Sequence, residues 1–253
     1  TLIRAMGEAG LFGAAFPEAV GGTDLGFMAV AVISEEISRL RPDLGYCMNL
    51  QAMTCPFTIL NWGTDEQAAR FVPPVIAGER IGAFMLTEPG GGSDPAGAMK
   101  TRAVRDGDDW VLNGQKVFIT NGILCDLVIV ACKTDPTLGG KGISLLVVEE
   151  GMAGFRKGRR LEKIGWKAQD TAELFFDDVR VPASNLIGAE GRGFVQLMEQ
   201  LPQERLIQAI RCCATMESAL DWTLDHVTER KAFGRPVADF QNTRFKLAEV
   251  RAE

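Results

Sequence analysis

Histidine and paired cysteines are scarce in this sequence. His226 is the sole histidine, and none of the six cysteines belongs to a C-x-x-C pair. Zinc sites use histidine imidazoles and closely spaced cysteine thiolates, so this composition argues against a zinc site. His226 is interpreted as a partly exposed helix residue, and no motif supports a Ser-His-Asp triad. The cysteines are interpreted as reduced thiols in a reducing compartment.

Long apolar and long basic stretches are also missing. No apolar run reaches the roughly 20 residues that a transmembrane helix needs, which argues against a membrane span. The net charge is −6 and no long basic run occurs, which argues against a nucleic-acid partner. With 253 residues, 46% hydrophobic and 24% charged, the chain has the composition of an ordinary globular protein with one large or two modest cores.

The dinucleotide-binding motif G-x-G-x-x-G is a third absence. In its place an apolar run, residues 81–86, leads into Thr87-Glu88-Pro89-Gly90-Gly91-Gly92-Ser93-Asp94. Consecutive glycines let another molecule approach the backbone closely, because glycine has no Cβ. The hydroxyls of Thr87 and Ser93 can donate or accept hydrogen bonds. This glycine loop predicts a cradle for a polar ligand, and the alternative is a plain surface loop.

Residues 1 to about 80 have the apolar period of helices. One predicted helix ends before Pro42 and carries five apolar residues at helical spacing: Phe27, Val30, Ile33, Ile37 and Leu40. We expect a second helix over about 45–60. A third begins with Thr64 as its N-cap and has acidic residues in its first turn.

From residue 81 the period changes to that of strands. Asp106-Gly107 and Asn113-Gly114 each separate two short apolar runs, which predicts two hairpin turns. Further strands are expected at about 127–132, 143–148 and 173–181, and the basic segment 157–163 is interpreted as a solvated loop. Evenly spaced strands without intervening helices indicate an antiparallel barrel or sandwich.

After Gly188 the helical period returns. Six residues form one stripe of a long helix that we expect to end near Gly234: Leu206, Ile210, Cys213, Leu220, Leu224 and Val227. Pro202 removes a backbone hydrogen bond and is expected to bend this helix. Pro236 is expected to open a further helix.

A second motif follows the glycine loop by about 20 residues and reads Asn113-Gly114-Gln115-Lys116-Val117-Phe118-Ile119-Thr120-Asn121-Gly122. Together the two segments resemble the flavin-binding signature of the acyl-CoA dehydrogenase family. The resemblance runs over nearly the whole chain. Two later segments, 165–176 and 201–206, are most similar to the long-chain acyl-CoA dehydrogenases.

The resemblance implies an α+β fold in three parts. These are an N-terminal helical domain over residues 1–80, a middle antiparallel β domain (barrel or sandwich) over 81–188, and the start of a C-terminal helical bundle over 189–253. Both ends of the chain resemble helix interiors, so we expect a piece of a longer protein with most of the C-terminal bundle missing. Residues 1–253 alone are expected to be unstable, because the apolar stripe of the long helix lacks its partners.

The resemblance implies FAD as the cofactor. Phe84, Leu86 and Thr87 are expected to meet the isoalloxazine and ribityl chain, and Gly92 and Ser93 the flavin phosphates or nearby substrate. The same comparison places Phe118 against the flavin ring and Thr120 near N5. Three residues are expected to reach the FAD of a neighbouring subunit: Arg230 at the pyrophosphate, with Phe233 and Gln241 at the adenosine half. The alternatives are a strand core residue for Phe118 and a helix-end arginine for Arg230.

The reaction implied is FAD-dependent α,β-dehydrogenation of an acyl-CoA thioester to the trans-2-enoyl-CoA, with flavin N5 taking the β-hydride. Most members carry the α-proton base in the C-terminal bundle. The long-chain and isovaleryl types carry a glutamate on the long helix, directly before an arginine, and Glu204 followed by Arg205 matches that pattern. Arg205 and Ser93 are expected to bind substrate. The alternative is an ordinary exposed glutamate, or one whose pKa is held low by Arg205 or Arg211.

Partners follow from the same resemblance. We expect an acyl-CoA substrate with a chain of about 10 carbons or more, because a bend at Pro202 would widen the cavity. Electron-transfer flavoprotein is the expected acceptor, in fatty acid beta-oxidation, and the assembly is a homotetramer (dimer of dimers) or homodimer. The location is cytoplasmic if the protein is bacterial and the mitochondrial matrix if it is eukaryotic. The alternatives are a flavin monooxygenase or oxidase of the same fold, and a non-catalytic flavin- or acyl-CoA-binding subunit of a hetero-oligomer.

Overall fold

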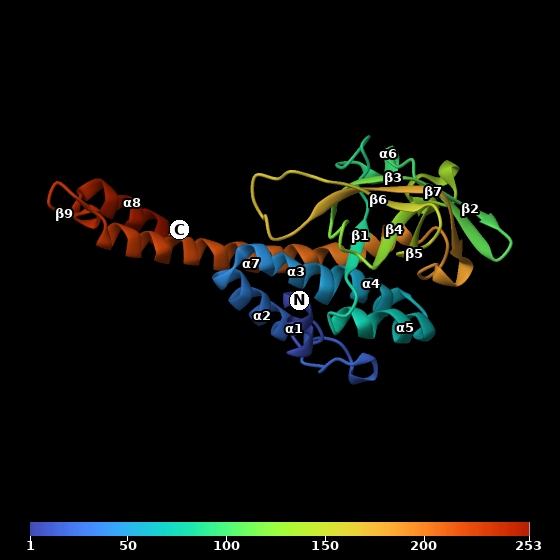
Figure 1. The fold of residues 1–253 in the computed structure, drawn as a ribbon, viewed down its shortest axis with the longest axis horizontal. Coiled ribbons are helices and arrows are strands. Elements are labelled where there is room, and N and C mark those ends of the chain that lie inside the picture. Colours follow the sequence, from blue (N-terminus) through green and yellow to red (C-terminus); the bar gives the residue numbers. More distant parts are fainter. Residues whose placement is uncertain (253) are drawn as a thin grey trace.

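The computed structural model describes residues 1–252, and its order is helices, then a sheet, then helices (Figure 1). The first part holds α1 (Leu2–Glu8), α2 (Gly26–Leu40), α3 (Pro42–Asn49), the π-helical turn η2 (Leu50–Thr54), α4 (Cys55–Trp62) and α5 (Asp65–Ile76). The middle part holds β1 (Gly82–Met85), α6 (Pro95–Ala98), β2 (Arg102–Asp106), β3 (Asp109–Thr120), β4 (Leu127–Lys133), β5 (Ile143–Glu149), β6 (Phe155–Arg160) and β7 (Thr171–Pro182). The last part holds α7 (Gly193–Glu229), β8 (Lys231–Ala232), β9 (Arg235–Pro236) and α8 (Gln241–Ala252). This order confirms the predicted α+β fold class.

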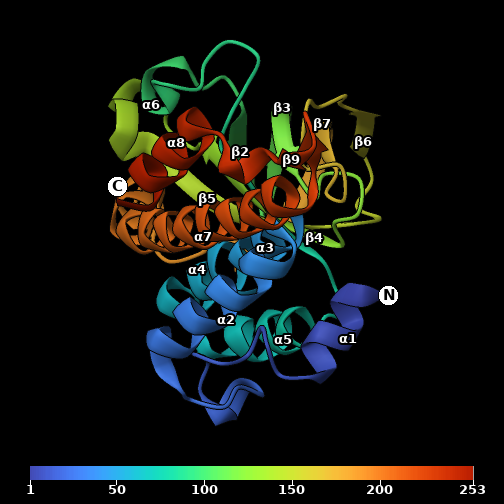
Figure 2. The same ribbon diagram turned by 90° about the vertical axis from the view of Figure 1, so that its left-hand side faces the viewer.

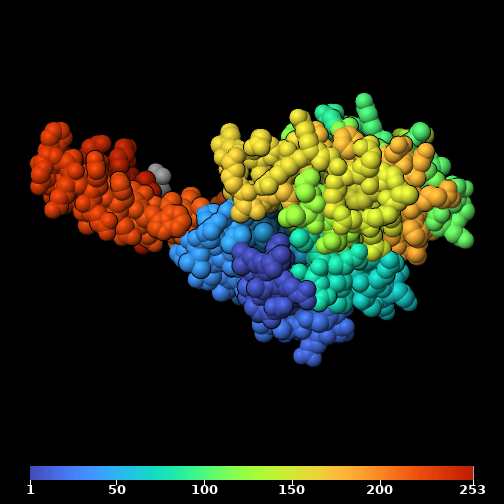
Figure 3. All heavy atoms as spheres, in the orientation of Figure 1, coloured from blue at the N-terminus to red at the C-terminus, as the bar shows by residue number. Residues whose placement is uncertain are grey.

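Helix α7 lies between the N-terminal helices and the sheet (Figure 2). It contacts α2, α3 and β5, and its C-terminal half projects away together with α8 (Figure 3). The hydroxyl of Ser218 on α7 donates to the carbonyl oxygen of Arg39 at 2.7 Å, which ties α7 to the end of α2. One long helix therefore connects the three parts of the chain.

The N-terminal helices follow the predicted signals. Helix α2 ends at Leu40, before Pro42, and α5 begins after Thr64 with a complete capping box to Gln67. The predicted helix over 45–60 is instead three consecutive pieces, α3, η2 and α4. Leu40 was expected on the apolar face of α2, yet it is 73% exposed, because it is the last residue of the helix and lies past the packed face.

The seven-stranded sheet has the order β1-β4-β2-β3-β7-β6, with β5 beside β4. Strands β1 and β4 pair in parallel, and β2 meets β4 in parallel through one residue pair. The prediction of a purely antiparallel sheet was therefore wrong in this detail, because the chain crosses over from β1 before it returns as β4. Strands β4 and β5 are buried on both faces, which explains why they read as continuous apolar runs.

Two turn predictions had different outcomes. The hairpin between β2 and β3 is confirmed at Gly107, where φ is 60°. Asn113-Gly114 makes no turn, because β3 runs through it and only shifts register against β7 between Leu112 and Gly114. A Cβ on Gly114 would lie 2.3 Å from Thr101 Oγ1. The glycine therefore serves close packing within the sheet, and one long strand carries the second motif.

The remaining corrections concern basic and C-terminal segments. Residues 155–160 form strand β6 on β7, so the prediction of a loop over 157–163 was wrong for its first part. Helix α7 ends at Glu229, before the small β8–β9 hairpin, and α8 begins at Gln241 and not at Pro236. Within residues 1–252, none of the helices combines the length and the apolar character needed to cross a membrane.

Candidate active site

Glu204 lies on the packed half of α7 and is half-buried. Burial raises the pKa of its carboxyl to about 7, and a hydrogen bond from the Thr54 side chain partly opposes this rise. No arginine contributes to that shift, and among residues 1–252 no ion pair joins Glu204 to Arg205 or Arg211. A carboxylate with a pKa near neutrality can accept a proton and release it again, which suits a general base.

The π-helical turn η2 positions the partner of Glu204. Thr54 is the last residue of this turn, and its Oγ1 accepts a hydrogen bond from Asn49 Nδ2 at 3.2 Å. The hydroxyl hydrogen is then available for Glu204. A π turn widens a helix locally, and such turns are frequent at functional sites. Sequence periodicity did not reveal this turn, because its residues still follow a helical apolar pattern.

Tyr46 connects Glu204 to the end of the long strand. Burial raises the pKa of Tyr46, a hydrogen bond with the Thr120 side chain lowers it, and the nearby charge of Glu204 raises it. Thr120 is the last residue of β3. The structure therefore brings two predicted residues, Glu204 and Thr120, close to the same tyrosine.

A buried ion pair fixes the start of the glycine loop. Lys116 is 0% exposed and donates from Nζ to Glu88 Oε1 at 2.8 Å and to the Leu86 carbonyl at 3.1 Å. Glu88 is 6% exposed and also accepts from the backbone N–H groups of Lys100 and Thr101. Burial opposes the ionisation of Glu88, but Lys116 and the other donors outweigh it and lower the pKa of this carboxyl. The pair joins the loop, the start of β2 and strand β3.

The three consecutive glycines have different roles. A Cβ on Gly91 would lie 2.3 Å from the Cβ of Ala98, so packing on α6 requires glycine there. A Cβ on Gly90 would meet nothing within 4 Å, and one on Gly92 only Thr87 Cγ2 at 3.6 Å. Neither has a positive φ. The fold itself does not demand glycine at 90 and 92, which fits a loop that another molecule approaches.

Phe118 presents its ring to the outside of β3. The ring is 67% exposed, and the residue has a φ of 61°. The register of β3 against β7 shifts between Lys116 and Ile119, around Phe118. A bulge re-aims a side chain, and a positive φ on a bulky residue costs about 1–3 kcal/mol. An exposed aromatic ring held at such a cost is suited to stacking on a planar ligand, and the alternative reading of Phe118 as a core residue is wrong.

The other predicted residues around the glycine loop differ in how far they are buried. Phe84, Leu86 and Thr87 are half-buried, and Gly92 and Ser93 are exposed. Phe84 and Leu86 also pack against the core between the sheet and the helices. Arg205 is exposed on α7 and has no ion pair within residues 1–252. The loop, Phe118 and Thr120 thus offer hydroxyls, open backbone and an aromatic face, which fits a flavin.

Arg230, Phe233 and Gln241 lie at the far end of α7. Arg230 follows the last residue of the helix, 96% of Phe233 is exposed, and Gln241 begins α8. Along a helix with a rise of 1.5 Å per residue, Arg230 lies about 39 Å from Glu204. These residues therefore do not join the Glu204 site of their own chain.

Four residues of the site were not predicted from the sequence: Tyr46, Thr54, Glu88 and Trp166. Tyr46 is the sole tyrosine of the chain, and Glu88 lies inside the glycine-loop motif, so a weak signal existed for both. Trp166 had no such signal, and Arg211 was considered only as an ion-pair partner of Glu204. The contact between Arg211 and Trp166 depends on how the β6–β7 connection folds over α7.

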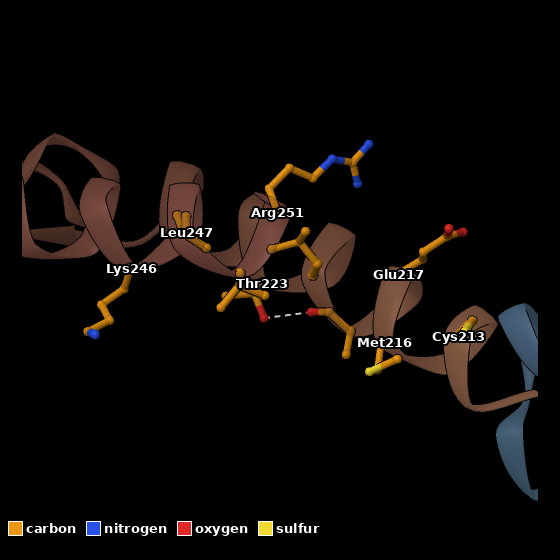
Figure 4. Close-up of a pocket in the computed structure, with 10 residues that line it drawn as sticks. Cys213, Met216, Glu217, Thr223, Lys246, Leu247 and Arg251 are labelled. Atoms are coloured by element: carbon orange, nitrogen blue, oxygen red, sulfur yellow. Dashed lines mark hydrogen bonds between the residues drawn. The ribbon is translucent and has the colours of Figure 1, made fainter. Parts of the chain in front are cut away.

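A groove between the C-terminal half of α7 and α8 is a separate feature. It is lined by Met216, Leu220, Leu247, Val250 and neighbouring residues, and Figure 4 shows its charged residues at the rim, with the Thr223 hydroxyl donating to the Ala219 carbonyl. It contains no cluster of titratable groups suited to catalysis. Residues 1–252 contain no group of three or more potential metal ligands.

The chain matches models and members of one protein family. Family models described as the N-terminal, middle and C-terminal domains of acyl-CoA dehydrogenase match residues 1–79, 83–179 and 191–253. The mitochondrial long-chain specific acyl-CoA dehydrogenase of Sus scrofa is 47% identical over 97% of this chain and 57% of the relative. An acyl-CoA dehydrogenase of Bacillus subtilis (strain 168) is 38% identical over 100% of this chain and 67% of the relative.

The fold agrees as well. The crystal structure of acyl-CoA dehydrogenase from Geobacillus kaustophilus has a TM-score of 0.95 and 46% identity, over 99% of this chain and 66% of that one. The chain spans about 57% of the length of the mammalian relatives that it matches. On these matches, the chain belongs to the acyl-CoA dehydrogenase family.

Proposed function

We propose that this protein oxidises an acyl-CoA thioester to the trans-2-enoyl-CoA with FAD as cofactor, and that Glu204 is the α-proton base. The observation that supports this best is a half-buried glutamate with a pKa raised to about 7, next to Thr54 and Tyr46. The pattern of Glu204 before Arg205 and the names of the long-chain relatives agree with it.

The flavin would be held by the face around the glycine loop. Phe118 would stack on the ring system, and Thr87 and Thr120 would hydrogen-bond its polar edge. The open backbone at Gly92 and the hydroxyl of Ser93 would accommodate phosphates or substrate. When bound, the flavin supplies the acceptor for the hydride.

The protein's own residues supply the proton transfer. Desolvation makes Glu204 a stronger base than a glutamate in water, and the Thr54 hydroxyl orients the carboxylate. The α-proton of the thioester passes to a Glu204 carboxylate oxygen.

Assembly is part of the proposal. Arg230, Phe233 and Gln241 are exposed, and Arg230 lies about 39 Å from Glu204, so these residues would serve the FAD of a neighbouring subunit in a homodimer or homotetramer. Electron-transfer flavoprotein would re-oxidise the flavin. The mitochondrial relatives support a matrix location in a eukaryote, and a bacterial protein would be cytoplasmic.

The test is anaerobic mixing of the FAD-loaded full-length protein with CoA thioesters of increasing chain length. Bleaching of the flavin absorbance, with 2-enoyl-CoA as product, supports the proposal. Bleaching followed by rapid re-oxidation in air would indicate an oxidase or monooxygenase. Binding of the ester without bleaching would indicate a non-catalytic subunit.

A further inference from the structure

An arginine and two aromatic rings form a cluster beside Glu204. The guanidinium carbon of Arg211 on α7 lies 4.9 Å from the ring centre of Tyr46 and 5.4 Å from that of Trp166. The two rings are 5.0 Å apart. Tyr46 belongs to α3 and Trp166 to the β6–β7 connection, so three separate segments enclose this arginine.

Arg211 lacks the acceptors that a buried guanidinium needs. It is 3% exposed, donates from Nη1 to Gln208 Oε1 at 2.8 Å and from Nη2 to the Pro42 carbonyl at 3.4 Å, and its Nε has no partner. A guanidinium has five N–H donors, so most remain unused. Within residues 1–252 no carboxylate forms an ion pair with it, since Arg211 is in none of the ion pairs there.

The surroundings do not replace a counter-ion. The titratable groups that act on Arg211 are Tyr46, Cys47 and Cys212, and none of them is a carboxylate. A cation over an aromatic face gains about 0.5–2 kcal/mol, whereas the penalty for burying an ion is several kcal/mol. Arg211 thus holds a positive charge with donors to spare in a site that excludes water.

The spacing between Glu204 and Arg211 limits the length of a ligand that could reach both residues. The two residues are two helical turns apart on the same face of α7, or about 10 Å along its axis. Tyr46 lies near both residues, since the charge of Glu204 raises the pKa of Tyr46 and the guanidinium of Arg211 lies over its ring. A chain whose α-carbon is at Glu204 and which follows this face would end near Arg211.

We propose that Arg211 binds a terminal carboxylate of the acyl chain, so that the substrate class is an ω-carboxyacyl-CoA of medium length. A planar guanidinium pairs with a carboxylate through two parallel hydrogen bonds. At about 1.2 Å per bond for an extended chain, the six bonds from the α-carbon to the carboxyl carbon of an eight-carbon chain span about 7 Å. The hydrogen bonds to the guanidinium span about 3 Å more, and together these lengths match the interval of about 10 Å. This inference rests on the proposed function and names the substrate of the same site.

The experiment compares two CoA esters of equal carbon number, octanoyl-CoA and its ω-carboxy counterpart, in the full-length holoenzyme. The expected kcat/KM for the ω-carboxy ester exceeds that for octanoyl-CoA at least tenfold. Arg211→Met should remove this preference by lowering the value for the ω-carboxy ester alone. Arg192→Met, an equal change of charge on an exposed residue at the start of α7, should leave the ratio unchanged.

Two results would overturn the inference. One is a wild-type ratio that favours octanoyl-CoA, which needs no variant and stands even when Arg211→Met does not fold. The other is an Arg211→Lys enzyme that keeps the full wild-type preference, because lysine cannot form the paired hydrogen bonds. If neither ester bleaches the flavin, the proposed function fails instead.

Discussion

Replacing Lys116 should destabilise the glycine loop, because its buried ion pair would be lost. Lys116→Met keeps the length of the side chain but takes away the ammonium that bonds Glu88 and the Leu86 carbonyl. Glu88 would then be a buried carboxylate held only by the backbone N–H groups of Lys100 and Thr101. Breaking one side of a buried pair costs about 3–5 kcal/mol. Because the two backbone donors still bond Glu88, we expect the free energy of unfolding to fall by an amount at the lower end of this range, about 3 kcal/mol.

The assay is denaturant unfolding of the full-length protein, together with the dissociation constant of FAD. Lys116→Met should lower the free energy of unfolding and weaken FAD binding, because Leu86 and Thr87 lose their anchor. Lys100→Met, an exposed neighbour, should change stability by less than about 0.5 kcal/mol. The double variant Glu88→Gln/Lys116→Met should be more stable than Lys116→Met alone, because no buried charge is left unpaired.

Equal stability of Lys116→Met and Lys100→Met would refute the reasoning. It would mean that water reaches Glu88 in solution. A double variant less stable than either single variant would also contradict it, because the cost would then come from packing and not from the unpaired charge.

Three further predictions concern pH, glycine and assembly. The rate of flavin reduction should rise with pH around 7, since Glu204 must be ionised and its pKa in the folded protein is about 7. The same raised pKa contributes stability that is fully present below pH 4.5 and is lost as pH rises through 7. Glu204→Gln should remove this dependence of the free energy of unfolding on pH. Gly91→Ala should destabilise the protein by about 1–3 kcal/mol through its clash with Ala98, whereas Gly90→Ala should leave the unfolding midpoint unchanged and weaken only FAD binding. Arg230→Ala should weaken FAD retention in gel filtration without changing the circular dichroism of the sheet, and tight FAD binding by a strictly monomeric full-length protein would contradict the cross-subunit role.

Periodicity and capping signals predicted most elements of the fold. The capping residue Thr64, the stop at Pro42 and the long helix α7 all follow from local sequence. The sheet was harder, because pairing partners are set by tertiary contacts. Asn113-Gly114 has the chemistry of a turn, but close packing on Thr101 uses the glycine inside a strand. The division of the chain at about residues 80 and 188 stays a prediction.

The site residues that belong to short motifs could be predicted from the sequence, whereas those brought together by tertiary packing could not. Glu204, Thr120 and the glycine loop came from short motifs, and their assigned roles remain proposals. The raised pKa of Glu204 depends on burial beside the π turn, which no local pattern shows. The bend expected at Pro202 does not carry the chain-length prediction, because Pro202 is on the exposed side of an unbroken α7. The meeting of Arg211, Tyr46 and Trp166 joins three distant segments.

The most direct test of the central claim is anaerobic stopped-flow reduction of the FAD-loaded Glu204→Gln protein at full length, with a CoA ester that bleaches the wild-type flavin. Glutamine keeps the shape of the side chain but cannot take the α-proton, so the rate should fall by on the order of 100- to 10,000-fold while ester binding is retained. Glu199→Gln, at an exposed position on α7, should reduce at the wild-type rate. Bleaching of Glu204→Gln at that same rate would contradict the account and point to a different carboxylate as the base.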